Sequence, residues 1–113
     1  MEYITSITNE PRQRFNLSVE GGGVVRIYLY YYSTQYAWYF DFEYNGYVCN
    51  GNKVVLSVNT LRHLRNRIPF GIGFLAGSNA EPFSVDDFST GRVIMTLLDS
   101  ADVEQFEEVY EQV

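Results

Sequence analysis

The sequence predicts an all-β fold, a small antiparallel β-barrel or sandwich that ends in a short C-terminal α-helix. First, aromatic residues make up 17% of the chain, and Tyr, Phe and Trp suit the pleated, half-buried surface of a strand. Second, apolar and polar residues alternate with the period of two that a strand imposes. Third, turns rich in glycine and asparagine separate many short segments, as in small sandwiches and barrels. The 113 residues are expected to form one domain, residues 1–113, with its own core.

The N-terminal part is expected to form a lead-in strand over residues 3–7, then a loop and an alternating strand over residues 14–20. Gly21-Gly22-Gly23 supplies the free backbone torsions that a tight reversal needs. The strand over residues 24–32 should therefore pair back on the strand before it. Residues 33–35 are polar and are expected to turn the chain again.

The next strand has the clearest alternation. One face is predicted to carry Trp38, Phe40, Phe42 and Tyr44, and the opposite face Tyr39, Asp41, Glu43 and Asn45. Asn45-Gly46 tolerates positive φ at both centres of a type I′ turn, so it predicts a hairpin into a strand over residues 47–49. These segments together predict an antiparallel meander of four strands.

The following segments are less regular. Residues 50–52 are predicted to form a turn and residues 53–58 a short strand. Residues 60–67 fit either one helical turn capped by Thr60 or an extended basic loop. The strand over residues 70–75 contains two glycines, which indicate bulges or a tight bend.

The C-terminal part is expected to begin with a long loop over residues 76–90, followed by a strand over residues 92–98 that is buried on both faces. Asp99-Ser100-Ala101-Asp102 can cap a helix, which we predict over about residues 100–111. One face of that helix carries Val103, Phe106, Val109 and Tyr110, and the other Glu104, Glu107, Glu108 and Glu111.

The composition of the chain argues against several classes of function. With 14 acidic and 8 basic residues and a formal charge of −6, the chain lacks the basic footprint of broad nucleic-acid binding, and no specific nucleic-acid binding is expected. No apolar stretch approaches the ~18 residues that cross a bilayer, so no membrane partner is expected. The N-terminus lacks a signal-peptide pattern, which predicts a cytoplasmic product. Cys49 is the single cysteine and is expected to be a buried small hydrophobe.

The sequence offers little catalytic chemistry. His63 is the single histidine, and a lone histidine is a poor metal ligand or general base, so it is expected in a surface loop. Asp86 and Asp87 are adjacent and should diverge, as loop polarity or a cap. The glycines over residues 71–77 are not followed by a helix, which argues against a dinucleotide site. We expect no enzyme activity, no catalytic or metal site and no cofactor.

Two sets of residues are candidates for a partner interface. The first is Tyr28, Tyr30 and Tyr32, which share one face of their strand, because tyrosine is common at interfaces. The alternative for that face is a second packed layer. The second set is Arg62, Arg65 and Arg67, which could dock on an acidic partner surface such as the C-terminal helix of a neighbouring copy. The alternative for these arginines is a solvated loop.

Several short sequence patterns occur along the chain in an order that can be compared with known protein families. They are Ile7-Thr8-Asn9-Glu10-Pro11-Arg12-Gln13-Arg14-Phe15, the strand over residues 25–29, Trp38-Tyr39-Phe40-Asp41-Phe42 before Asn45-Gly46, the Ile72-Gly73-Phe74 strand, Pro82 with Asp87-Phe88, and the strand over residues 92–97. In this order the chain resembles the baseplate plug family of contractile-tailed bacteriophages.

The resemblance implies a structural virion protein of the phage tail baseplate, made in the host cytoplasm. It would plug the tail tube bore by packing against baseplate hub and tail tube proteins, and self-association would be compatible with that role. It implies no catalysis and no cofactor. Two alternatives remain open from the residues: a small β module that binds carbohydrate through the exposed aromatic strip, and an enzyme or enzyme subunit.

Overall fold

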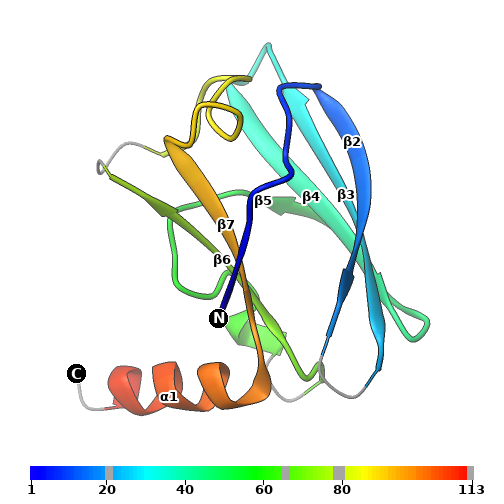
Figure 1. Cartoon of the computed structure of the whole chain (residues 1–113), viewed down its shortest axis with the longest axis vertical. Coiled ribbons are helices and arrows are strands. Elements are labelled where there is room, and N and C mark those ends of the chain that lie inside the picture. The colour runs from blue at the N-terminus through cyan, green and yellow to red at the C-terminus, as the bar shows by residue number, and fades with distance from the viewer. Residues whose placement is uncertain (20–21, 65–66, 78–80, 112–113) are drawn as a thin grey trace.

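A computed structural model describes residues 1–19, 22–64, 67–77 and 81–111, with residues 106–111 described as helix backbone. It contains two antiparallel sheets, which form an open sandwich and are not closed into a barrel (Figure 1). The four-stranded sheet has the order β2 (Arg12–Ser18), β3 (Val24–Tyr32), β4 (Ala37–Tyr44) and β5 (Tyr47–Lys53). The three-stranded sheet has the order β1 (Glu2–Ile4), β7 (Val93–Leu98) and β6 (Gly71–Ala76). A 3-10 turn (Arg62–Leu64) precedes β6, and α1 (Ser100–Glu111) follows β7.

The predicted meander of four strands is confirmed. Trp38 and Phe40 are fully buried and Phe42 is 2% exposed, whereas the intervening Tyr39 and Asp41 are partly exposed. The hairpin turn has the positive φ values that the sequence requires, 49° at Asn45 and 81° at Gly46. Local alternation and turn chemistry therefore suffice to predict the strand order of this sheet.

The core between the two sheets is aromatic. Rings of β4 meet rings from the second half of the chain, with centroid distances of 5.6 Å from Phe40 to Phe74 and 5.7 Å from Phe42 to Phe70. Trp38 likewise lies edge-on to Phe88 at 5.3 Å. Such pairs add roughly 0.5–1.5 kcal/mol each beyond their buried area, so the aromatic residues of β4 join the two layers.

The turn predicted over residues 50–52 is wrong. β5 continues to Lys53 and contains a bulge, where the pairing register shifts between Phe40 and Phe42 of β4. Gly51 takes the positive φ of 73°, and its N–H donates to Asp41 Oδ1 at 2.7 Å. The bulge lets the strand continue past the extra residue, with glycine at the strained position. Cys49, before the bulge, is half-buried rather than buried.

The strand predicted over residues 53–58 is also wrong, apart from Lys53 at the end of β5 and an isolated bridge between Ser57 and Phe74. This segment runs beside β6, because Ser57 and Phe74 exchange two backbone hydrogen bonds, and the two β6 glycines allow its close approach. A Cβ atom at Gly73 would overlap the carbonyl oxygen of Val58 and would lie 2.7 Å from Thr96 Oγ1. Gly73 therefore permits a close backbone approach, whereas Gly71 makes room for the Asn59 side chain. The bulge expected from them is absent, because the β6–β7 register is unbroken from Gly71 to Ala76.

The basic segment adopts the helical alternative, as the 3-10 turn at Arg62–Leu64. Its cap is Asn59 rather than the predicted Thr60, because the Leu61 N–H donates to Asn59 Oδ1 at 3.0 Å. The Thr60 hydroxyl instead donates to the carbonyl of Ile72 at 2.8 Å.

The two ends of the chain meet at β7. The lead-in strand is shorter than predicted and pairs with β7 in the three-stranded sheet. β7 is buried on both faces except at Ile94, which is 38% exposed. α1 spans the predicted range and is capped as predicted, since the Asp102 N–H donates to Asp99 Oδ1 at 2.8 Å. Val103 of the predicted apolar stripe is half-buried; the side chains of Phe106, Val109 and Tyr110 lie outside the described part.

Candidate protein interface

The face of the four-stranded sheet that points away from the three-stranded sheet, here called the outer face, carries the predicted tyrosines. Tyr28, Tyr30 and Tyr32 alternate along β3 with core residues. Their rings meet edge-on, with centroids 5.0 Å apart for Tyr28 and Tyr30 and 5.4 Å apart for Tyr30 and Tyr32. Tyr28 and Tyr30 are partly exposed and Tyr32 is 43% exposed. The structure therefore assembles these three residues into one tyrosine strip on the surface.

Hydrogen bonds hold the centre of the tyrosine strip in place. The Tyr30 hydroxyl donates to Asp41 Oδ1 at 2.9 Å, and Tyr39 of β4 stacks on Tyr30 at 6.0 Å. Burial and, after it, the hydrogen bond to Asp41 raise the pKa of Tyr30 to about 12. Because Asp41 also anchors the β5 bulge through Gly51, the strip is built on a rigid part of the sheet. A rigid aromatic surface loses little conformational entropy when a partner binds.

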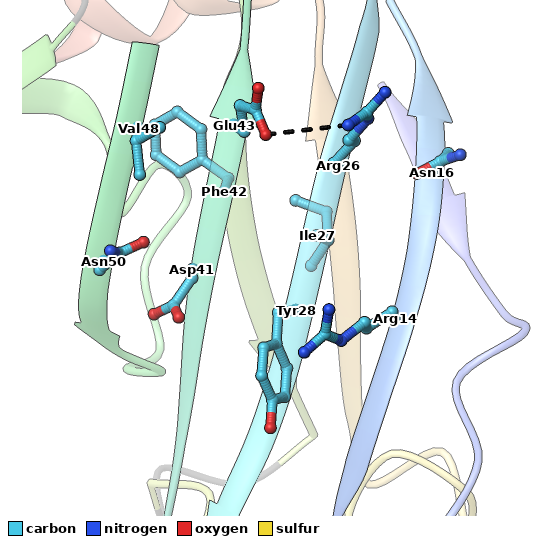
Figure 2. Close-up of a pocket in the computed structure, with 10 residues that line it drawn as sticks. All are labelled: Arg14, Asn16, Arg26, Ile27, Tyr28, Asp41, Phe42, Glu43, Val48 and Asn50. Carbon is cyan, nitrogen blue, oxygen red and sulfur yellow. Dashed lines mark ion pairs between the residues drawn. The ribbon is translucent and has the colours of Figure 1, made fainter. Parts of the chain in front are cut away.

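Basic side chains flank the tyrosines on the same face. Strand pairing places Arg12 opposite Tyr30, and Arg14 opposite Tyr28. The Arg14 guanidinium lies over the Tyr28 ring, 4.5 Å from its centroid, as Figure 2 shows. Sequence analysis did not single out these two arginines. Their alternation with Phe15 and Leu17 in β2 is the pattern that could have identified them as outward-facing.

The outer face contains a shallow hollow of about 370 Å³ that crosses the strands of this sheet. It is lined by Arg14, Asn16, Arg26, Ile27, Tyr28, Asp41, Phe42, Glu43, Val48 and Asn50 (Figure 2). Arg26 and Glu43 face each other across it at 4.0 Å, a distance and an exposure at which an ion pair contributes little. Mixed charge, an open shape and aromatic edges suit contact with another protein surface.

The predicted arginines lie elsewhere. The Thr60 N–H donates to the carbonyl of Ile72 at 2.7 Å, which places the segment before the 3-10 turn beside β6 in the three-stranded sheet. Arg67 is exposed and Arg62 is half-buried, whereas Arg65 lies outside the described residues. The structure thus places the tyrosines and the basic segment against different sheets. The predicted set does not form one contiguous site.

A buried ion pair, which sequence analysis missed, lies in the loop before β7. Asp87 is 3% exposed and binds Arg92 through both carboxylate oxygens, at 2.7 Å to Nε and 2.8 Å to Nη2. The N–H groups of Phe83 and Ser84 also donate to Oδ2, at 2.7 and 2.8 Å. Burial alone would raise the pKa of Asp87, but the hydrogen bonds from Arg92, Ser84 and Phe83 together lower it. The charge is thereby satisfied within the protein, as in a structural pair.

This loop also joins the two sheets. Trp38 Nε1 donates to the carbonyl of Ser84 at 2.9 Å, and the Tyr31 hydroxyl donates to the carbonyl of Phe83 at 2.6 Å. Both donors come from the four-stranded sheet, whereas Arg92 leads directly into β7. Asp86 is exposed and makes no carboxylate contact with Arg92, so the adjacent acids diverge as predicted.

Other chemistry is sparse in the part of the chain that the structure describes. His63 is exposed. No group of three or more His, Cys, Asp or Glu side chains with metal-binding geometry occurs among those residues. Over the same residues, no helix combines the length and the apolar character needed to cross a bilayer.

Fold and surface together define a small two-sheet antiparallel β protein. Its outer face, with the tyrosine strip and the neighbouring arginines, has a composition that suits protein contacts. A family model described as "Cyanophage baseplate Pam3 plug gp18" matches residues 1–100. The chain therefore belongs to this family of phage baseplate plug proteins. The resemblance seen in the sequence is thereby confirmed, as is a structural role in the phage tail baseplate. No curated protein matches the chain.

Proposed function

We propose that the protein closes the bore of the tail tube by packing against the baseplate hub and tube proteins until the tail contracts. The observation that carries this proposal is the family match, which includes every strand of both sheets. The proposed mechanism is steric closure, released by a conformational change at infection. It involves no catalytic step, and the protein would be made in the host cytoplasm before it joins the virion.

The construction of the body supports this role. A plug must resist deformation, and here aromatic pairs and the Asp87–Arg92 loop connect the two layers. Close-packed interiors have low compressibility and transmit strain. The tyrosine strip and its neighbouring arginines offer a surface of the composition found at protein interfaces. We therefore propose the outer face as the principal contact with the neighbouring tail proteins.

The proposal is tested by locating the chain in purified phage tails. Mass spectrometry should detect it in baseplates, and cryo-electron microscopy should place its density across the tube end in extended tails and displaced from it in contracted tails. Absence of the chain from baseplates, or density on the outer rim in both states, would contradict the plug role.

Point variants test the surface separately from the location. Tyr32→Ala should reduce incorporation into tails, because it removes an exposed ring of the tyrosine strip. The matched control is Tyr3→Ala, which removes a ring that is 56% exposed on the other sheet. Equal incorporation of both variants would contradict the outer face as the contact. A glycan-array signal lost in Tyr32→Ala would instead favour carbohydrate recognition.

A further inference from the structure

The net negative charge of the chain comes entirely from its C-terminal segment, residues 99–111. Of the 14 acidic residues, six lie in residues 99–111: Asp99, Asp102, Glu104, Glu107, Glu108 and Glu111. Residues 1–98 therefore hold eight acidic residues (14 − 6) and all 8 basic ones, and their net charge is zero. Residues 99–111 thus carry the whole net charge of −6 and contain no basic residue, whereas the rest of the described chain has no net charge.

The same segment extends beyond the two sheets. α1 leaves the end of β7 and runs away from the four-stranded sheet (Figure 1). Its first turn is fixed to the body, because the Asp102 carboxylate pairs with the Met1 ammonium group at 2.6 Å. The family match ends at residue 100, where α1 begins. The helix therefore follows the part of the chain that the family model describes, and its first turn is paired with the N-terminal end of the three-stranded sheet.

The outer face has the opposite charge. It carries Arg12, Arg14, Arg26 and Lys53 against Asp41 and Glu43, which gives +2 (4 − 2) on this face. Glu43 already faces Arg26, and Asp41 already accepts two hydrogen bonds. Within the described part of the chain, Arg12, Arg14 and Lys53 form no ion pair. Three cations next to a tyrosine strip therefore remain available to carboxylates from another molecule.

We propose that α1 of one copy docks on the outer face of a second copy, with its carboxylates against Arg12, Arg14 and Lys53. The tyrosine strip would supply contact area, since aromatic rings bury surface at low entropic cost. In each molecule α1 and the outer face lie on opposite sides (Figure 1). The contact is therefore head-to-tail, and successive copies would form a ring or an open chain. It does not depend on closure of a tail bore, and it can be tested without tails.

Sedimentation velocity of the purified full-length chain across a concentration series tests the contact. We expect concentration-dependent association that weakens when salt is raised from about 0.1 M to about 1 M, because screening shortens from about 10 Å to about 3 Å. Arg12→Glu/Arg14→Glu should weaken association at least about tenfold, since it places like charges against α1. Arg67→Glu makes a charge change of the same kind at an exposed site beside the other sheet and should leave association unchanged.

A charge-swap mixture makes the test specific to this pairing. Glu104→Arg/Glu108→Arg should also weaken association when alone, because it lowers the charge of residues 99–111 from −6 to −2 (−6 + 4) and places two cations against a cationic face. Mixed with Arg12→Glu/Arg14→Glu, it should restore association, because each variant supplies the complement that the other lacks. Near-ultraviolet circular dichroism of Trp38 verifies that both variants are folded. A parent chain that stays monomeric, an outer-face variant that associates like the parent, or a folded mixture that stays monomeric would each overturn the proposal.

Discussion

Asp87→Asn should be one of the most destabilising single-atom changes in this protein. The carboxylate is 3% exposed and accepts two hydrogen bonds from Arg92 and two from backbone N–H groups. An asparagine keeps one oxygen and turns the other position into a donor, which then faces donors. It also leaves the Arg92 charge without its counter-ion.

The magnitude follows from the burial of the two partners. Removing one member of a buried pair costs about 3–5 kcal/mol. The Arg92 side chain is 26% exposed and can recover some hydration, so we expect a loss of about 2–4 kcal/mol. In a chain of this size that corresponds to a fall in Tm of about 10 °C or more. Urea unfolding followed by Trp38 fluorescence measures it, because Trp38 contacts the same loop through Ser84.

The neighbouring residue provides a matched control. Asp86→Asn makes the same chemical change at an exposed carboxylate, which accepts a long hydrogen bond of 3.5 Å from Asn9 Nδ2. It should change the free energy of unfolding by less than about 0.5 kcal/mol. If Asp87→Asn cost no more than Asp86→Asn, the assignment of the buried pair as a structural clamp would be refuted.

The pH dependence gives a second measurement on the same pair. The pKa of Asp87 is lower in the folded protein than its ordinary value of 3.8. Its contribution to the free energy of unfolding is therefore complete above pH 3.8 and is lost as the pH falls through the folded pKa. Asp87→Asn should lack that part of the acid sensitivity. An unchanged acid profile would contradict the reasoning.

Two further predictions concern Gly73 in β6 and the tyrosine strip. Gly73→Ala should destabilise the protein by about 1–3 kcal/mol through overpacking against the Val58 carbonyl, whereas Gly77→Ala, with open space around its Cβ, should be nearly neutral in the same urea unfolding assay. The raised pKa of Tyr30, about 12 against 10.0, means that the folded state keeps its proton longer, so stability should fall as pH rises from 10 towards 12. Tyr30→Phe should lose less stability over that range in alkaline unfolding curves, because it has no phenol to ionise. An identical pH profile would contradict a Tyr30 pKa raised by burial and by the hydrogen bond to Asp41.

The sequence was sufficient for elements that depend on near neighbours. The alternation from Trp38 to Tyr44 defines which face of β4 is buried, because a strand repeats every two residues. Asn45-Gly46 defines the hairpin, since only certain residues tolerate positive φ. Asp99 and Asp102 define the start of α1, because the first N–H groups of a helix lack partners. Each of these requirements acts within a few residues.

The sequence was insufficient where a residue's role depends on a distant partner. The glycines of β6 indicated a bulge, but Gly73 makes room for the Val58 carbonyl and Gly71 for the Asn59 side chain. The Asn50-Gly51 pair indicated a turn, but Asp41 on the neighbouring strand makes it a bulge. In both cases the local preference of glycine permits several backbone forms, and tertiary contacts select one.

The candidate surface was likewise predicted in part from local sequence and in part defined by tertiary contacts. Period-two alternation alone put Tyr28, Tyr30 and Tyr32 on one face. The pairing of β2 with β3 then added Arg12 and Arg14, and the path of the chain after β5 separated the basic segment from them. Local sequence thus determined the strands, the turns and the helix cap, because sterics and periodicity act between neighbours. The strand order of the three-stranded sheet, the buried ion pair and the composition of the surface were decided only when distant segments packed together, because burial and the pairing of strands far apart in the sequence depend on the whole chain.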